Sequence, residues 1–113
     1  MLQQKIKEKI IQNSISLQRF GLNELAWRKK DAQNFINDIM KDKIGILGGD
    51  VYKLTPKQLE PLCDNWSCEP IATESEENYH SRSKFESLKY IANYPVQKGE
   101  KILFSIIFTE KII

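Results

Sequence analysis

The sequence has few of the side chains that catalytic and metal sites require. Its 113 residues include one histidine, His80, and two cysteines, Cys63 and Cys68. General acid–base catalysis and nucleophile activation need a base beside an activated group, and no nucleophile-elbow sequence is present. Structural zinc normally takes four closely spaced ligands, more than these side chains provide. The composition therefore favours a protein that is not an enzyme and that binds no metal or cofactor.

Long apolar segments are also missing. The longest run, residues 102–108, has seven residues, whereas a membrane-spanning helix needs about 20. Residues 1–9 lack the apolar core of a signal peptide. We therefore expect a cytoplasmic protein whose cysteines stay reduced. On a single strand over residues 62–68, Cys63 and Cys68 would also point to opposite faces, too far apart for a disulfide.

Signals for nucleotide and nucleic-acid binding are weak. Gly48-Gly49-Asp50 lacks the spacing and the following lysine of a phosphate-binding loop. A glycine pair in a β-rich segment instead indicates a bulge or a close backbone approach. The net charge is only +2, and basic residues do not interleave with aromatic ones as they do in single-strand nucleic-acid binders. We expect a protein that binds neither nucleic acid nor a membrane.

Charge is unevenly distributed along the chain. Residues 1–47 carry nine basic and five acidic side chains, residues 48–78 carry two and seven, and residues 79–113 carry six and three. The middle segment is therefore acidic, while both flanks are basic. Acidic residues at a helix start explain part of this pattern, and an acidic face for a basic partner is the other interpretation.

Hydrophobic periodicity predicts one domain over residues 1–113 with about three helices. Apolar residues at helical spacing indicate helices over residues 3–19 and 31–42. Residues 22–27 fit either a short strand or a helical turn. The chain is long enough to bury a single, modest core.

The third predicted helix has clear start and end signals. Thr73 and Glu76 fit a capping box, with Thr73 as the N-cap. Pro95 disfavours helical geometry at the residue before it, so the helix should end near Asn93. Its expected buried face consists of Phe85, Leu88, Ile91 and Ala92.

Three β-rich segments predict strands, over residues 44–52, 62–68 and 101–109. The last segment is apolar on both faces, which is typical of a central strand that other layers cover. The order helix, helix, strand, strand, helix, strand predicts an α+β fold with a small mixed or antiparallel sheet.

Polar and aromatic residues gather on the first two predicted strands. If these strands pair, Asp50-Val51-Tyr52 and Asp64-Asn65-Trp66 lie side by side. Tryptophan and tyrosine are enriched at protein interfaces because they offer a large, rigid contact area with a polar tip. In the other interpretation Trp66 belongs to the core, and Asp64 and Asn65 close a turn.

Several short motifs between residues 15 and 108 follow one another in a characteristic order. They are Gly21-Leu22-Asn23-Glu24-Leu25-Ala26, Ile46-Leu47-Gly48-Gly49-Asp50-Val51-Tyr52, Asp64-Asn65-Trp66, Glu74, Tyr79, Arg82-Ser83 and Tyr90-Ile91. In this combination the chain resembles the immunity protein 40 family of bacterial polymorphic toxin systems.

The resemblance implies a non-enzymatic antidote in the cytoplasm. Such a protein binds a cognate toxin domain and covers its active site or an adjacent surface, with a few aromatic anchors giving affinity and charge speeding encounter. The residues expected to contact the partner are Asp50, Tyr52, Asp64, Asn65 and Trp66, with Glu69 and Glu74 adding negative potential.

Two other functions stay open on the sequence alone. A small metal-dependent hydrolase could use Asp50, Asp64 and Glu74, and it predicts a bound divalent cation in a concave site. A structural or regulatory homodimer could form if Ile112-Ile113 extends an open sheet edge, and it predicts a concentration-dependent dimer.

Overall fold

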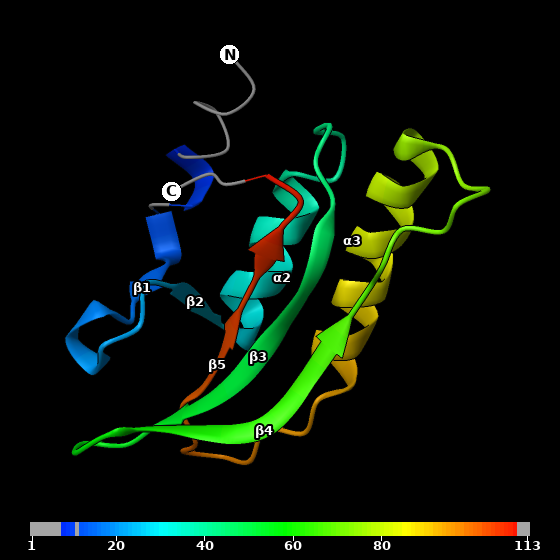
Figure 1. Cartoon of the computed structure of the whole chain (residues 1–113). Helices are drawn as coiled ribbons and strands as arrows, with labels where there is room; N and C mark the ends of the chain where they lie inside the picture. Colours follow the sequence, from blue (N-terminus) through cyan, green and yellow to red (C-terminus); the bar gives the residue numbers. More distant parts are fainter. Residues whose placement is uncertain (1–7, 11, 111–113) are drawn as a thin grey trace.

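One antiparallel sheet with two long helices on one face organises residues 8–10 and 12–110, which the computed structural model describes (Figure 1). The strands are β1 (Ile15–Ser16), β2 (Leu25–Arg28), β3 (Ile46–Leu54), β4 (Leu59–Ser67), β5 (Ile102–Ser105) and β6 (Ile107–Phe108). The helices are α2 (Lys29–Asp38) and α3 (Glu76–Asn93), with a 3-10 turn, η1 (Gln18–Phe20). The strand order is β1-β2-β5-β3-β4, with β6 beside β3. The α+β prediction is confirmed, and all strand pairs are antiparallel.

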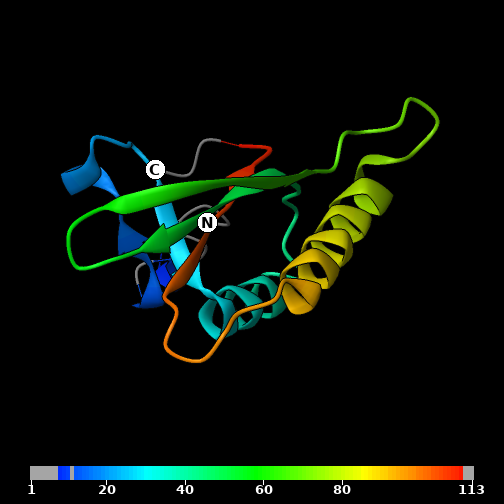
Figure 2. The same cartoon turned by 90° about the horizontal axis from the view of Figure 1, so that it is seen from below.

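The two faces of the sheet carry separate apolar clusters. The larger one fills the space between the sheet and the helices α2 and α3, which lie on the same side of it (Figure 2). There, Trp27 of β2 stacks on Phe35 of α2 with 4.9 Å between ring centroids. On the other face, Leu17 and Tyr52 form a smaller cluster. β5 runs between β2 and β3 and is buried on both sides, as predicted for a central strand.

The predicted helix over residues 3–19 is wrong in its second half. Residues 8–10 and 12–13 are helical, but β1 and η1 follow, and residues 3–7 and 11 lie outside the described part. Ile10 packs in the larger cluster and Leu17 in the smaller one. The apolar residues that were expected to form one helix face therefore lie on opposite faces of the sheet. Tertiary pairing of β1 with β2 has overridden the local helical pattern. Gly21 ends η1 with a φ of +84°, which a glycine adopts without strain.

The second predicted helix is shifted towards the N-terminus, because α2 spans Lys29–Asp38 and not residues 31–42. The C-cap and the turn that follows the helix are held by α3. Lys84 of α3 is fully buried, and its ammonium donates hydrogen bonds to the carbonyl oxygens of Ile39 (3.0 Å) and Asp42 (2.6 Å). A cation at this end also suits the helix dipole. The contact joins residues far apart in sequence, so no local pattern could predict it.

The start of α3 lies two residues after the predicted one. Ser75 is the N-cap, and its hydroxyl accepts a hydrogen bond from the Asn78 amide at 3.1 Å. The capping box that begins at Thr73 is therefore wrong, although Glu76 does lie in the first turn. The helix ends at Asn93, as predicted.

The buried face of α3 also differs from the prediction. Phe85 is 62% exposed and Ala92 is exposed, so only Ile91 and the half-buried Leu88 fit. The buried residues of the helix are Tyr79, Ser83, Lys84, Ser87 and Ile91. Serines occupy the buried face because they accept hydrogen bonds there, since the Ser83 hydroxyl lies 3.0 Å from the Ile46 amide nitrogen. Small side chains also allow the helix to approach the sheet closely.

The glycine pair in β3 makes the close approach that the sequence indicates. A Cβ atom on Gly49 would overlap the Ser105 carbonyl oxygen and the ring of Trp66. One on Gly48 would overlap the backbone of Trp66 and Ser67. The glycines therefore let β5 and β4 pack tightly against β3.

β4 is an edge strand with an irregular middle. It begins at Leu59, three residues before the predicted start. Pro61 pairs with Tyr52 and Asn65 pairs with Asp50, so residues 62–64 lie opposite one residue of β3. Cys63 occupies this bulge with a φ of +61°. Cys63 is exposed and Cys68 is buried, and both are free, as predicted.

Two predictions concern membranes and the C-terminus. Within residues 8–10 and 12–110, neither long helix combines the length and apolarity needed to cross a membrane. The predicted contact through Ile112-Ile113 lies outside the described residues.

Candidate protein-binding surface

The two polar-aromatic motifs lie side by side, as the sequence predicts. Asp50 pairs directly with Asn65 across β3 and β4, and Gly49 pairs with Trp66. Because side chains alternate along a strand, the motifs contribute to both faces of the sheet. The seven residues expected to contact a partner therefore fall into three groups.

The first group lies on the face away from the helices. Tyr52 is 7% exposed within the smaller apolar cluster, and burial together with the Glu24 and Asp50 carboxylates raises its pKa to about 12. Asp50 is half-buried, and its amide donates to the Ser105 hydroxyl at 3.1 Å. Asn65 is exposed beside it. Asp50 and Asn65 thus present polar groups over a tyrosine that is largely inaccessible.

The second group packs against α3. Trp66 is 8% exposed, and its indole N–H donates to the Ser87 hydroxyl at 2.9 Å. Its ring stacks on Tyr90 with 4.9 Å between centroids. This Trp66 contact places the residue in the core, as one of the two sequence interpretations expects.

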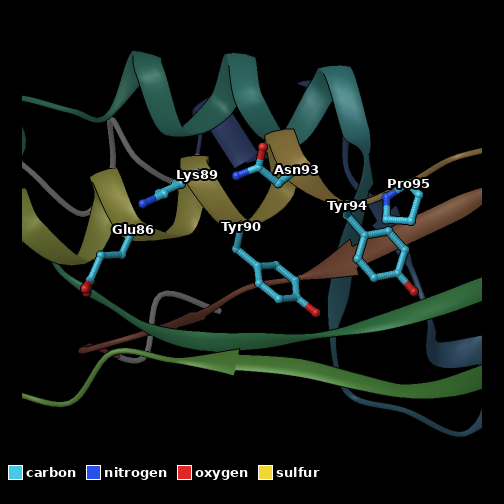
Figure 3. A pocket seen from close by; sticks show the side chains of 6 residues that line it. All are labelled: Glu86, Lys89, Tyr90, Asn93, Tyr94 and Pro95. Atoms are coloured by element: carbon cyan, nitrogen blue, oxygen red, sulfur yellow. The ribbon is translucent and has the colours of Figure 1, made fainter.

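Asp64 lies on the same side but at the surface. Its carboxylate accepts a hydrogen bond from the Tyr94 hydroxyl at 2.6 Å. Burial and the nearby Asp64 charge raise the pKa of Tyr94. Figure 3 shows Tyr90 and Tyr94 extending from the end of α3 towards the strands. Asp64 therefore connects the bulge in β4 to the C-terminal end of α3.

A shallow groove of about 420 Å³ runs along this end of α3. It is lined by Glu86, Lys89, Tyr90, Asn93, Tyr94 and Pro95 (Figure 3). These residues were not among those expected to form a site. The helical spacing of Glu86, Tyr90 and Tyr94 was the signal that could have identified a shared helix side.

The third group, Glu69 and Glu74, lies in the loop of residues 68–75 and is held by Arg82. The guanidinium donates to both carboxylate oxygens of Glu74 at 2.7 and 2.8 Å. It also donates to the Glu69 carbonyl oxygen and to the Glu86 carboxylate, each at 2.8 Å. Hydrogen bonds from Arg82 lower the pKa of Glu74, and Glu74 in turn raises that of Arg82. We call this set of contacts the Arg82 clamp.

The same part of the molecule is acidic. Residues 58–81 contain six acidic side chains and no lysine or arginine. These are Glu60, Asp64, Glu69, Glu74, Glu76 and Glu77. Glu76 and Glu77 occupy the first turn of α3, where they stabilise the helix dipole. The others lie along β4 and the next loop, and we refer to Asp64, Asn65, Glu69 and Glu74 as the acidic rim.

The carboxylates proposed for a metal-dependent hydrolase do not converge. Asp50 and Asp64 belong to opposite faces of the sheet, and Glu74 is engaged by Arg82. Among the residues that the structure describes, no three histidine, cysteine, aspartate or glutamate side chains are placed to hold a metal ion together.

Comparison with known proteins agrees with the resemblance seen in the motifs. The family model described as Immunity protein 40 matches residues 16–108, from the end of β1 to the end of β6. No curated protein and no solved structure matches the chain significantly. The family match covers most of the chain and all three groups of residues described above. The chain therefore belongs to the immunity protein 40 family, a family of immunity proteins of toxin systems.

Proposed function

We propose that this protein is a cytoplasmic antidote that binds one cognate toxin domain and neutralises it without catalysing a reaction. The observation that carries the proposal is the family match over residues 16–108. An immunity protein acts on a toxin made by the same cell or its kin, so the partner is a protein. Neutralisation then follows from coverage of the toxin's active site or of a surface beside it.

The surface that we propose for this contact is the acidic rim. Asp64, Asn65 and Glu69 are exposed there, and Glu74 is half-buried. Asp50 borders the rim through its pairing with Asn65. The remaining two expected contact residues, Tyr52 and Trp66, are buried and hold the strands in place beneath the rim.

Charge and rigidity support this choice. Complementary charge between the rim and a basic toxin surface would speed association and disfavour wrong partners. The Arg82 clamp and the β3–β4 pairing fix the rim in the free protein, which reduces the ordering that binding requires. Association should therefore be fast at low ionic strength and slow down as salt is added.

Co-expression with the C-terminal domain of the neighbouring gene product tests the proposal. Cell survival and recovery of a stable complex are the expected results. An Asp64→Asn, Glu69→Gln double variant should associate more slowly, whereas Asp38→Asn, which removes an exposed acid on α2, should behave as the wild type. Unchanged toxicity in the presence of folded, soluble wild-type protein would refute the function for that pair.

A further inference from the structure

The loop of residues 68–75 projects from the body of the molecule and exposes an apolar side chain. Figure 2 shows the loop reaching beyond the start of α3 and the end of β4. Ile71 lies in it and is 54% exposed. Single exposed apolar side chains are common on protein surfaces. This isoleucine differs in its position at a projecting loop, where it is accessible to another molecule.

The loop is held on both sides of Ile71. Arg82 binds the Glu69 carbonyl oxygen before it and the Glu74 carboxylate after it. The Glu74 amide donates to the Ile71 carbonyl oxygen at 2.9 Å, which closes a turn. Pro70 has a fixed φ angle, so the backbone before Ile71 has little freedom. The position of Ile71 is therefore set before any partner binds.

The start of the loop is anchored in the core. The Tyr79 hydroxyl donates to the Cys68 carbonyl oxygen at 2.6 Å, and the Cys68 amide donates to the Leu47 carbonyl oxygen at 2.8 Å. These bonds connect the loop to α3 and β3. A loop with such supports loses little conformational entropy on binding, which favours affinity.

Acidic residues lie on both sides of Ile71 along the chain. Glu69 is exposed on one side, and Glu76 and Glu77 are exposed at the start of α3. The positive charge of Arg82 is shared with Glu74 and Glu86, so it does not balance these acids. An apolar centre within a polar rim is the usual arrangement of an interface hot spot.

We propose that this loop is the part of the protein that enters the toxin, with Ile71 in an apolar pocket bordered by lysine or arginine side chains. The inference rests on the proposed function and adds to it the anchor residue and the chemistry of the partner's pocket. Arg82 acts as a positioning residue, because it fixes the loop that carries Ile71 and does not itself enter the partner's pocket.

The test measures the affinity of the full-length chain for the toxin domain, made inactive by substitution so that it can be purified. Ile71→Ala should weaken binding by about 30-fold, the size of a hot-spot truncation. Ile71→Asp should abolish it. Phe85→Ala is the matched control, because Phe85 is 62% exposed on α3 outside the loop, and we expect it to bind as the wild type. Melting temperatures of all three variants should stay near that of the wild type.

The outcomes separate the two proposals. If the wild type binds the toxin and Ile71→Ala binds equally well, the inference about the loop is wrong while the proposed function stands. If Phe85→Ala loses affinity in place of Ile71→Ala, the contact lies on the outer side of α3. If the wild type does not bind, the proposed function fails and the loop inference falls with it.

Discussion

Two of the contacts between α3 and the β4 side of the molecule differ in their chemistry. The Trp66 contact is buried and combines ring stacking on Tyr90 with a neutral hydrogen bond to Ser87. The Arg82 clamp lies near the surface and uses charged groups to hold a projecting loop. The comparison indicates that the first contact maintains the fold and the second one shapes the surface. Stability and recognition should therefore respond to different substitutions.

The largest expected effect is on the buried contact. Trp66→Ala should lower the free energy of unfolding by about 3–5 kcal/mol, because it removes a large core side chain and leaves a cavity. Urea denaturation followed by circular dichroism measures the change. Trp66→Phe keeps much of the packing and should cost less. A loss of under about 1 kcal/mol for the alanine variant would contradict the assignment of Trp66 to the core.

Lys84 gives the next largest effect and extends the comparison to α2. Lys84→Met should destabilise the fold by about 1–3 kcal/mol, because the carbonyl oxygens of Ile39 and Asp42, in the turn after α2, lose their donor. Burial lowers the pKa of Lys84, so part of this loss is offset by removing a poorly solvated charge. Lys89→Met, on an exposed position of the same helix, should change the unfolding free energy by less than about 0.5 kcal/mol. Equal values for both variants would argue against a structural role for the buried amine.

As the pH rises into the alkaline range, the buried regions should lose stability before the Arg82 clamp does. Burial raises the pKa of the Cys68 thiol from 9.0 to about 11, and the pKa of Tyr52 is raised from 10.0 to about 12. Raised values contribute stability that is complete below the ordinary pKa and is lost as the pH rises through the folded-state pKa. The free energy of unfolding should thus fall from about pH 9 upward, and Tyr52→Phe should make the fall less steep. A constant stability up to pH 11.5 would contradict these directions.

The smallest expected effect on stability belongs to the clamp. Arg82→Gln should leave the melting temperature close to that of the wild type, since surface ion pairs contribute little. The loop should nevertheless open, and a protease specific for glutamate should cut after Glu74 more quickly, whereas Pro70 protects the bond after Glu69. In the wild type, the same loosening should appear as the pH falls from about 4.5 through the lowered pKa of Glu74. Unchanged cleavage rates in Arg82→Gln would show that the clamp does not restrain the loop.

The sequence predicted the features that depend on local patterns. Composition and the position of proline predicted three of them. These are the pairing of the Asp50 and Asn65 motifs, the central strand over residues 102–105 and the end of α3 before Pro95. What it did not predict depends on contacts between distant residues. Phe85 was predicted to be a core residue because it is apolar. The buried face instead holds Ser83, whose hydroxyl accepts a hydrogen bond from the Ile46 amide. Hydrogen bonds between distant elements determine which face of the helix is buried, and the periodicity of apolar residues does not reveal these bonds.

The exposure of the expected contact residues was predicted only in part, for a related reason. Aromatic residues were expected to be contacts, yet Trp66 and Tyr52 are buried. The acidic residues of the same motifs reach the surface, as their charge requires. The contribution of Arg82 could not be recognised, because its partners lie up to thirteen residues away along a loop without a regular pattern.

The bulge in β4 has a consequence for the protein in a crowded cell. β4 is a free edge of the sheet, and such edges invite pairing with another chain. Pro61 has no amide hydrogen to donate, and the left-handed backbone at Cys63 interrupts the row of donors and acceptors a short distance further on. The edge of β4 therefore offers no continuous row of hydrogen-bonding groups, which disfavours pairing with a strand of another chain at this place.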